Sequence, residues 1–443
     1  MRLPVMFPFI ALTALVFSVL SGAAQADAAL NERLLQAGDE LEPDVIALRR
    51  HFHQNPELSN REFETAKRIA QELRAMGLKP ETGIASTGVV AILKGGKPGP
   101  LVALRADIDA LPVEEQVDLP FASKARGTYR GNDVGVMHAC GHDTHIAMLL
   151  GAARALVAVK DELPGSVMFI FQPAEEGAPE GETGGAERML AEGLFKGRKP
   201  VAVFGLHTFA NFPAGTIAYR SGPAMASSDR FTITVKGQQT HGSRPWGGVD
   251  PIVTAAQIVM AVQTIASRQV DVTKAPSVIS FGIIEGGVRN NIIPDEVELV
   301  GTIRNFDMGI RAQIHEKLKH TAETIALSAG ATAEVEIILG YPVTINDPAL
   351  TAQMLPTVKR VVGEEGVFES PLVTGAEDFS YYALETPGLF LFLGGSPPGV
   401  DATQQPSNHS PLFYVDESTL KTGVNVLTNL VADYLAQASQ ESR

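Results

Sequence analysis

Cysteine is nearly absent from this 443-residue chain, in which Cys140 is the only one. A single cysteine excludes a disulfide framework within the chain, so the thiol needs another explanation. Positive charge is also scarce, because 36 Lys and Arg residues stand against 50 Asp and Glu residues and give a formal net charge of −14. An acidic chain of this kind is a poor partner for nucleic acid or an anionic membrane.

Long apolar runs are missing from the chain beyond its first residues. The run from Phe7 to Leu20, followed by Ala24-Gln25-Ala26, predicts an export signal over residues 1–26 that is cleaved after Ala26. An uncleaved anchor is the alternative, but the run is shorter than the roughly 20 residues needed to span a bilayer. We therefore expect a periplasmic or secreted protein that has no membrane segment after cleavage.

Two patterns of helices and strands divide the remaining chain. Over residues 27–224 and 341–443 amphipathic helices alternate with short β-rich runs, which predicts an α/β domain with a mostly parallel sheet. Over residues 225–340 the predicted order is β-α-β-β-α-β, which is typical of a ferredoxin-like α+β domain. We expect this second segment to be a separate domain inserted into the first.

The sequence MHACGHDTH, residues 137–145, surrounds the lone cysteine with histidines. Asp143 is placed to cap the helix that follows, so Cys140 and His142 are expected just before a helix N-terminus. Partial positive charge there favours a thiolate, which is the form of cysteine that binds metal. Two candidate ligands do not define a site, and a buried inert cysteine beside an incidental histidine is the alternative.

Other candidate ligands follow predicted strands. Glu175 and Glu176 come after one strand, His207 closes another, and His409 lies in a turn-forming stretch. Taken singly, the two glutamates suit a solvated surface pair and His207 suits a core histidine. Their joint occurrence favours a metal site, because zinc-like ions take sulfur, imidazole nitrogen and carboxylate oxygen from loops on a rigid scaffold.

These motifs together resemble the metal-dependent amidohydrolase and metallopeptidase family of aminoacylases and carboxypeptidases. The resemblance is strongest to its N-acyl-amino-acid branch, which includes hippurate hydrolases and auxin-conjugate hydrolases. It covers nearly all of the mature chain and rests on these segments: RRHFHQNPELSNREFETAKRIAQEL, RADIDALPVEE, MHACGHDTH, FQPAEEG, GLH, THGSRPWGGVDP, NNIIPDEVELVGTIR, TGAEDFSYY and NHSP.

The resemblance implies a ligand set for up to two divalent ions. Its members are Cys140, His142, Glu176, His207 and His409. Thiolate and imidazole suit zinc, and manganese, cobalt and nickel stay open. Glu175 then matches the general base, which takes a proton from the attacking water and returns it to the departing amine.

Two aspartates on an early strand bear on the same site. Asp109 matches the residue that orients a metal-bound histidine. Asp107 stands where many relatives have a first histidine ligand, and its role stays open between a ligand, a group behind the ligands and a plain polar residue. We interpret Cys140 as part of the compensation for the missing histidine.

In the inserted segment the resemblance implies three further site residues. His241 matches a histidine that reaches into the active site of a partner subunit and steadies the oxyanion, which implies a homodimer formed through this lid domain. Asn291 and Arg304 match residues that hold the substrate carboxylate, and a guanidinium fork suits that group. Without the resemblance, Asn291 suits a turn residue and Arg304 an exposed charge at a strand end.

Several other residues suit metal or pocket roles less well. His138 and His145 share the cysteine motif, but five ligands are already available. His51 and His53 are expected to face solvent or to brace the N-terminal helix. Trp246, the only tryptophan, is expected to pack or to line the pocket.

The sequence therefore predicts hydrolysis of the amide bond of N-acyl amino acids, with acetyl, benzoyl or other acyl groups. A dipeptidase or carboxypeptidase with the same site is the closest alternative. A non-catalytic protein that captures metal or N-acyl amino acids is the contrasting one. A carboxylate base beside a metal ligand has no purpose in a capture protein, so Glu175 tells against it.

Overall fold

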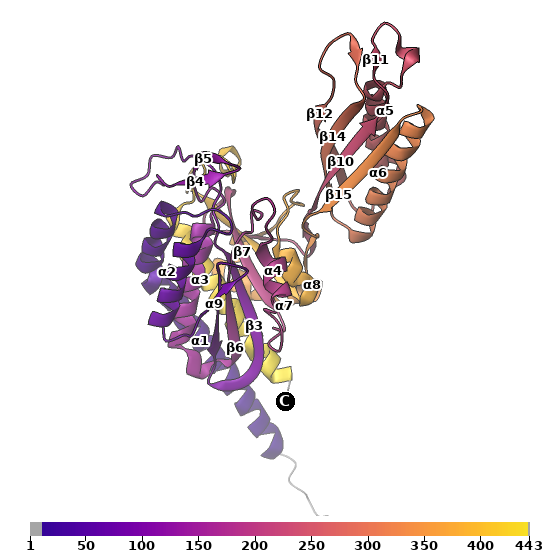
Figure 1. Ribbon diagram of the computed structural model, residues 1–443. Coiled ribbons are helices and arrows are strands. Elements are labelled where there is room, and N and C mark those ends of the chain that lie inside the picture. Colours follow the sequence, from indigo (N-terminus) through magenta and orange to yellow (C-terminus); the bar gives the residue numbers. More distant parts are fainter. Residues whose placement is uncertain (1–10, 442–443) are drawn as a thin grey trace, which may run out of the picture. The chain divides into compact units, whose positions relative to one another are not determined.

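A computed structural model describes residues 11–441, and the side chains of residues 28–440. Contacts divide the chain into two compact units (Figure 1). Of the described residues, the first contains 11–218, 352–368 and 389–441, and the second contains 219–351 and 369–388. The predicted inserted segment, residues 225–340, lies entirely within the second unit.

An eight-stranded mixed sheet forms the centre of the first unit. Its strands β6, β3 and β7 are parallel, whereas β1, β2 and β6 pair antiparallel, as do β18 and β8. The order across the sheet is β1 (Glu81–Ile84), β2 (Gly88–Lys94), β6 (Pro164–Gln172), β3 (Lys97–Asp107), β7 (Val203–Pro213), β18 (Gly388–Ser396), β8 (Ile217–Tyr219) and β17 (Val367–Glu369).

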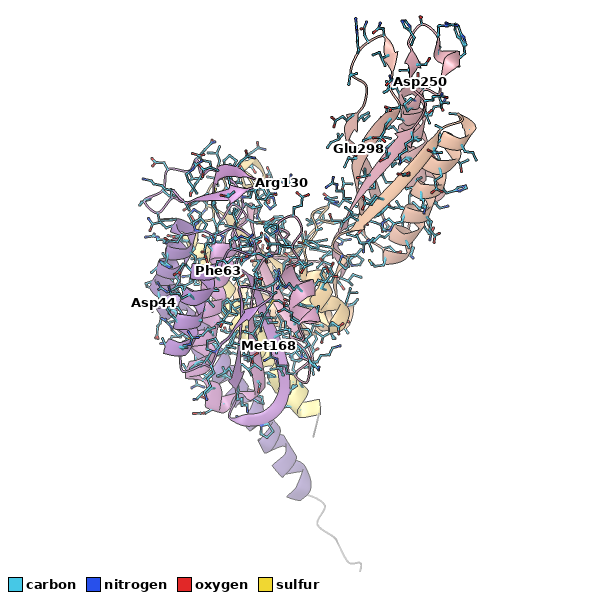
Figure 2. All side chains as sticks on the ribbon, viewed as in Figure 1. Asp44, Phe63, Arg130, Met168, Asp250 and Glu298 are labelled. Atoms are coloured by element: carbon cyan, nitrogen blue, oxygen red, sulfur yellow. The ribbon has the colours of Figure 1, made fainter. Side chains whose placement is uncertain are left out.

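The parallel strands are buried on both faces. Residues 167–172 of β6 are all fully buried, although successive side chains of a strand point to opposite faces. Met168, labelled in Figure 2, is one of them. A continuous apolar run is therefore what this position in the sheet requires, since both faces are covered.

Helices of the first unit cover this sheet. Helices α3 and α9 contact β3, α1 packs on α3 and α9, and α2 contacts β2. Asp44 of α1 is exposed and labelled in Figure 2. The helices are α1 (Ala11–Gln54), α2 (Phe63–Ala75), α3 (His142–Ala158), α4 (Gly185–Ala191), α7 (Pro348–Val362) and α9 (Leu420–Glu441).

The second unit contains a four-stranded antiparallel sheet in the order β12-β14-β10-β15. Its elements in chain order are β10 (Ser227–Lys236), α5 (Pro251–Thr264), β12 (Ser277–Glu285), β14 (Glu296–Asn305), α6 (Met308–Ser328) and β15 (Thr332–Leu339). Side chains of α5 and α6 pack with Phe231, Ile233 and Leu299 in one apolar core. The structure confirms the α/β class with a ferredoxin-like β-α-β-β-α-β domain.

Shorter elements complete the two units. They are the hairpin β4 (Arg126–Tyr129) and β5 (Asn132–Gly135), the pair β9 (Gly222–Met225) and β16 (Thr344–Asn346), the pair β11 (Thr240–His241) and β13 (Ile292–Ile293), and helix α8 (Phe379–Glu385).

The predicted export signal overlaps the start of α1. Residues 1–10 lie outside the described part of the chain, and residues 11–26 form the first part of α1. Among the described residues, none of the helices combines the length and the apolar character that crossing a membrane requires.

Candidate metal centre

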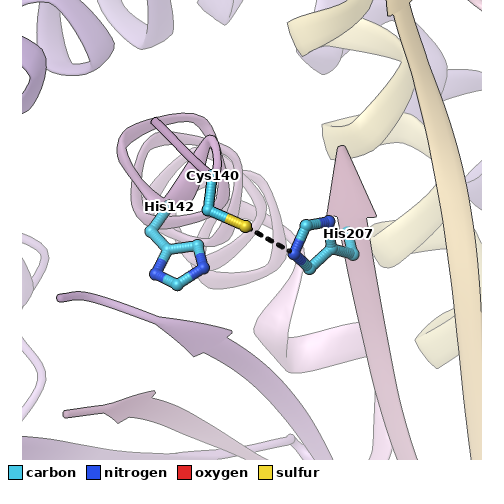
Figure 3. A group of neighbouring side chains, drawn as sticks. All are labelled: Cys140, His142 and His207. Carbon is cyan, nitrogen blue, oxygen red and sulfur yellow. Dashed lines mark hydrogen bonds between the residues drawn. The ribbon is translucent and has the colours of Figure 1, made fainter. Parts of the chain in front are cut away.

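The structure brings together the five predicted ligands of the first unit. Cys140, His142 and His207 have donor atoms within 4.8 Å of one another, and so have Cys140, Glu176 and His409. Figure 3 shows the first of these groups. The sulfur of Cys140 and the Nε2 atom of His207 are turned toward each other. Segments far apart in the chain thus converge at one place.

The ends of the parallel strands explain this convergence. Strand β6 ends at Gln172, three residues before Glu175, and α3 begins at His142. Strand β7 does not end at His207, as the sequence predicted, but continues to Pro213. Its pairing with β3 nevertheless stops at Gly205, so His207 lies just beyond the part of β7 that pairs with β3.

The donor atoms are spaced as atoms that share an ion would be. Cys140 Sγ lies 3.2 Å from His409 Nε2 and 3.4 Å from His207 Nε2. His142 Nε2 lies 3.8 Å from Glu176 Oε1, which is 3.3 Å from His409 Nε2. These separations are all shorter than the sum of two bonds of about 2.1 Å to a common ion.

An orphaned nitrogen supports the same interpretation. His142 is fully buried, and its Nε2 has no hydrogen-bond partner in the part of the chain that the structure describes. Three carboxylates, those of Asp107, Glu175 and Glu176, each place an oxygen 3.8 Å from it, which is too far for a hydrogen bond. A buried nitrogen facing acidic groups across such a gap fits a divalent cation, and the thiol, imidazoles and carboxylate form a donor set suited to one.

Asp109 ties two candidate ligands together from behind. The Nδ1 of His142 lies 2.9 Å from the Asp109 backbone oxygen and 3.2 Å from Oδ1. Asp109 Oδ2 accepts hydrogen bonds from the Glu176 backbone N–H and the Ser59 hydroxyl. With its proton on Nδ1, His142 would present the Nε2 lone pair to an ion.

Asp107 is paired with His145, and its carboxylate also lies within 4.8 Å of donor atoms of His142 and of His207 and Glu377. The carboxylate of Asp107 lies 2.5 Å from His145 Nδ1 and accepts a hydrogen bond from Arg105. The other ring nitrogen of His145 accepts the backbone N–H of Thr208 at 2.8 Å. Both nitrogens of His145 are therefore engaged, which leaves no lone pair for an ion.

Glu175 follows Ala174, which has a strained backbone conformation and is hydrogen-bonded to the side chain of Glu62. Ala174 has φ +52°, an uncommon conformation for a residue other than glycine. Its backbone N–H donates to Glu62 Oε1 at 2.9 Å, and Glu62 Oε2 accepts from the Thr87 hydroxyl. Burial, and then the charge of Asp109, raises the pKa of Glu62 to about 8.

Burial and neighbouring charges set the protonation of the cluster. Burial raises the pKa of the Cys140 thiol, and the carboxylates of Glu176 and Glu175 raise it further. Burial lowers the pKa of His142, but Asp107 and Asp109 outweigh this effect and raise it to about 10. Burial lowers the pKa of His207 well below its usual range. Binding of a cation would therefore displace protons.

The predicted capping role of Asp143 is wrong. The N-cap of α3 is Gly141, with φ +93° and no side-chain cap, and Asp143 lies in the first turn. Its Oδ2 accepts from Arg49 Nε at 2.9 Å and lies 2.9 Å from His53 Nδ1. The buried cation and imidazole of α1 compete with the backbone for this carboxylate, and His53 thereby braces α1 against α3.

His138, two residues before Cys140, is a further buried histidine. Neither of its ring nitrogens has a hydrogen-bond partner among the described residues, and burial lowers its pKa to about 3.

The predicted site residues of the second unit lie at two ends of its sheet. His241 is exposed, and its Nδ1 accepts the backbone N–H of Ser243. Asn291 is next to it, because its backbone oxygen accepts the Gly242 N–H at 2.9 Å. Arg304 is the penultimate residue of the ten-residue β14, which begins five residues after Asn291. A strand of that length extends roughly 30 Å, so one chain does not bring Arg304 to the other two.

Trp246 is 78% exposed in a short turn of the second unit. In this chain it packs into no core, so the packing role considered for it is not supported within the described residues.

Sequence reasoning missed two residues that act on the site through backbone groups. Glu62 holds Ala174, and Asn408 binds the backbone of Cys140 and Thr208. The only sequence signal for Asn408 is its position beside His409, and Glu62 has none. Glu62 is 112 residues from Ala174 in the chain. Asn408 is 268 residues from Cys140 and 200 residues from Thr208.

Comparison with known proteins adds the family. Residues 103–433 match peptidase family M20/M25/M40. The chain is 42% identical over 396 residues to Thermostable carboxypeptidase 2 of Saccharolobus solfataricus, which covers 89% of this chain and 96% of that protein. It is 38% identical over 380 residues to N-acetyl-L-cysteine deacetylase of Bacillus subtilis, which covers 86% of this chain and 85% of that protein.

A solved structure shares the fold. The crystal structure of a dinuclear metal-binding peptidase of the M20 family from Bacillus subtilis matches with a TM-score of 0.74 and 35% identity. The match covers 90% of this chain and 99% of that one.

Proposed function

The chain belongs to peptidase family M20/M25/M40 and is a metal-dependent amidohydrolase that acts on amide bonds of amino acids, and we propose that its substrates are N-acyl amino acids. The products are a carboxylic acid, such as acetic or benzoic acid, and a free amino acid. The similarity to N-acetyl-L-cysteine deacetylase supports this substrate class.

One observation carries the hydrolytic part of the proposal. Glu175 Oε2 lies 3.8 Å from His142 Nε2, so a carboxylate stands at the edge of the donor cluster. The carboxylate takes a proton from a water molecule as its oxygen attacks the amide carbon. It then returns the proton to the nitrogen of the departing amine, which leaves as a neutral group.

The donor cluster supplies the place for the metal. We propose that Cys140, His142, Glu176, His207 and His409 hold up to two divalent ions, of zinc or manganese, with cobalt or nickel as alternatives. When bound, such an ion polarises the amide carbonyl and lowers the pKa of water. Asp109 keeps His142 and the Glu176 backbone in place for that role.

A substrate panel tests the proposal. The protein is stripped with a chelator, reloaded with zinc or manganese, and assayed for amine release from N-acetyl and N-benzoyl amino acids and from dipeptides. We expect release from N-acyl amino acids in the reloaded protein and none in the stripped one. Binding without release from any member of the panel would contradict the proposal and favour a capture protein.

A carboxypeptidase or dipeptidase is the second candidate. It rests on the similarity to Thermostable carboxypeptidase 2, which covers 89% of the chain, against 86% for the deacetylase. Both activities need a free carboxylate on the substrate, so the site residues do not separate them. The ratio of kcat/KM for N-benzoylglycine to that for a dipeptide separates them directly.

We also propose that the enzyme is a homodimer formed through the second unit. Ile252, Val253 and Met260 of α5 are exposed apolar residues that a partner would cover. The separation of Arg304 from His241 and Asn291 along β14 supports the same idea, because two copies would be needed to place all three around one substrate. His241 would then act in the partner's site.

Mixing two inactive variants tests this arrangement. His241→Ala and Arg304→Ala each damage a different contribution to the site. If the contributions come from different subunits, a mixed dimer contains one site with neither defect. We expect the mixture to regain activity after subunit exchange, and no regain would contradict the shared site.

We further propose that the protein is exported to the periplasm or secreted after cleavage behind Ala26. The apolar run 7–20 and the sequence Ala24-Gln25-Ala26 support it. N-terminal sequencing of the mature protein tests it, with Asp27 as the expected first residue.

A further inference from the structure

The side chain of Asn408 joins three segments that carry candidate ligands. Its Nδ2 donates to the backbone oxygen of Cys140 at 3.1 Å and to that of Thr208 at 2.9 Å. Its Oδ1 accepts the backbone N–H of Ala210 at 3.4 Å. Asn408 itself precedes His409, so its amide connects the Cys140 loop, strand β7 and the His409 turn.

The acceptor on Thr208 is shared with a candidate ligand. The backbone oxygen of Thr208 also lies 3.0 Å from Nδ1 of His207. A hydrogen bond to that oxygen keeps the proton of His207 on Nδ1, so that Nε2 faces Cys140 Sγ at 3.4 Å. By holding Thr208, Asn408 therefore fixes the group that orients His207.

The turn at His409 needs such support. His409 has φ +73°, a conformation that costs free energy for a residue other than glycine and persists only where its surroundings impose it. Its backbone N–H donates to the oxygen of Ala139 at 2.7 Å. Together with Asn408, this bond pins the turn to the residues on either side of the Cys140 peptide.

Asn408 also approaches the sulfur. Its Nδ2 lies 3.9 Å from Cys140 Sγ, which is within range of a weak N–H···S contact. A donor beside a metal-bound thiolate withdraws charge from the sulfur. Both the position and the charge of this ligand thus depend on one amide.

We propose that Asn408 is a positioning residue of the metal centre, which sets the geometry of Cys140, His207 and His409 through their backbone and through the sulfur. This inference rests on the proposed metal site and adds a residue that binds neither metal nor substrate. Its loss would change how the ion is held in a protein that is still folded.

The experiment uses Co²⁺ as the probe of the full-length protein. Asn408→Asp keeps the shape of the side chain but removes the N–H donors, and Asn408→Ala removes the whole amide. The matched control is Asn429→Asp in α9, because the Asn429 side-chain amide likewise donates to a backbone oxygen, that of Asn425. Affinity for Co²⁺ is measured by competition with a chelator, and the sulfur-to-cobalt absorption band is recorded.

We expect both Asn408 variants to bind Co²⁺ about 10- to 100-fold more weakly than the wild type. We also expect their sulfur-to-cobalt absorption band to shift or to become weaker. We expect Asn429→Asp to match the wild type in both. Circular dichroism measures the folded fraction, so that the absorption band is compared for folded protein only. If Asn408 had a merely structural role, its variants would have a lower melting temperature but an unchanged band.

Two failures can be told apart. If the wild type binds Co²⁺ with a sulfur band and the Asn408 variants do the same with equal affinity, the positioning role is overturned and the proposed function stands. If the wild type itself binds no Co²⁺, the proposed metal centre fails and the inference fails with it.

Discussion

Each of the two units buries a cluster of ionisable side chains, and the clusters differ in how their hydrogen bonds are satisfied. In the second unit, Asp229 accepts two hydrogen bonds from Arg311 and one from the Gly340 backbone, and it lies 2.8 Å from His315 Nε2. In the first unit, His142 Nε2 is buried and has no hydrogen-bond partner among the described residues.

The difference separates a structural cluster from a binding one. Burying a polar atom without a partner costs free energy, and a folded chain tolerates that cost where another group completes the site. The Asp229 cluster needs nothing further, whereas the cluster around His142 has donors of the type that metal ions take. Substitutions in the Asp229 cluster should lower stability, whereas substitutions in the cluster around His142 should lower activity or metal binding.

The largest expected effect is on turnover. Glu175→Gln keeps the shape of the side chain but cannot accept a proton, so we expect kcat to fall about 10²- to 10⁴-fold while metal content stays unchanged. Metal content is measured by elemental analysis and kcat on the best substrate of the panel. Glu176→Gln is the companion variant and should lose metal as well. Full activity in Glu175→Gln would contradict the role of the base.

The structural cluster should respond in stability alone. Asp229→Asn leaves the buried Arg311 without its charged partner, so we expect the free energy of unfolding of the second unit to fall by about 3–5 kcal/mol. Urea denaturation measures it, and metal affinity serves as the internal control. Loss of metal from the folded variant would break the contrast between the units.

The pH dependence of stability tests the buried acid behind Glu175. Glu62 has a pKa of about 8, against an ordinary value of 4.5. Between these values the folded chain keeps a proton that the unfolded chain releases, so stability falls as pH rises through this window. Glu62→Gln should remove this slope. We expect the variant to gain about 3–4 kcal/mol relative to the wild type from about pH 5 to about pH 8.

Urea denaturation of both proteins at the two pH values measures this gain. Parallel curves for the wild type and the Glu62→Gln variant would show that Glu62 carries no such proton in the folded protein.

The smallest expected effect is at Asp109. Asp109→Asn keeps an acceptor for His142 Nδ1 but removes the negative charge, so we expect metal affinity to fall about 10- to 100-fold with little change in stability. Chelator competition measures the affinity. An unchanged affinity would place Asp109 among the merely structural groups, beside Asp229.

Much of the fold was predictable because its signals are local. The buried run of β6 and the β-α-β-β-α-β order of the second unit are patterns of adjacent residues, and the structure confirms both elements. The end of β7 was misplaced, since Thr208 to Pro213 continue the strand without an apolar run to mark it.

The candidate ligands were predictable in a different way. Cys140 lies beside a helix N-terminus, Glu176 follows the end of β6, and His207 follows an apolar run within β7, so residue type and position suffice to suggest them. The groups that hold them were not predictable. Asp143 binds Arg49 instead of capping its helix, and Glu62 and Asn408 act on backbone atoms that only the folded chain brings within reach.

X-ray absorption spectroscopy of the zinc-loaded protein tests the contrast between the two clusters most directly. If the cluster around His142 is completed by an ion, the zinc edge should show one sulfur at about 2.3 Å together with nitrogen and oxygen ligands at about 2.0–2.2 Å, and the sulfur should vanish in Cys140→Ser. A zinc ion with nitrogen and oxygen neighbours only, identical in the wild type and in Cys140→Ser, would contradict the account.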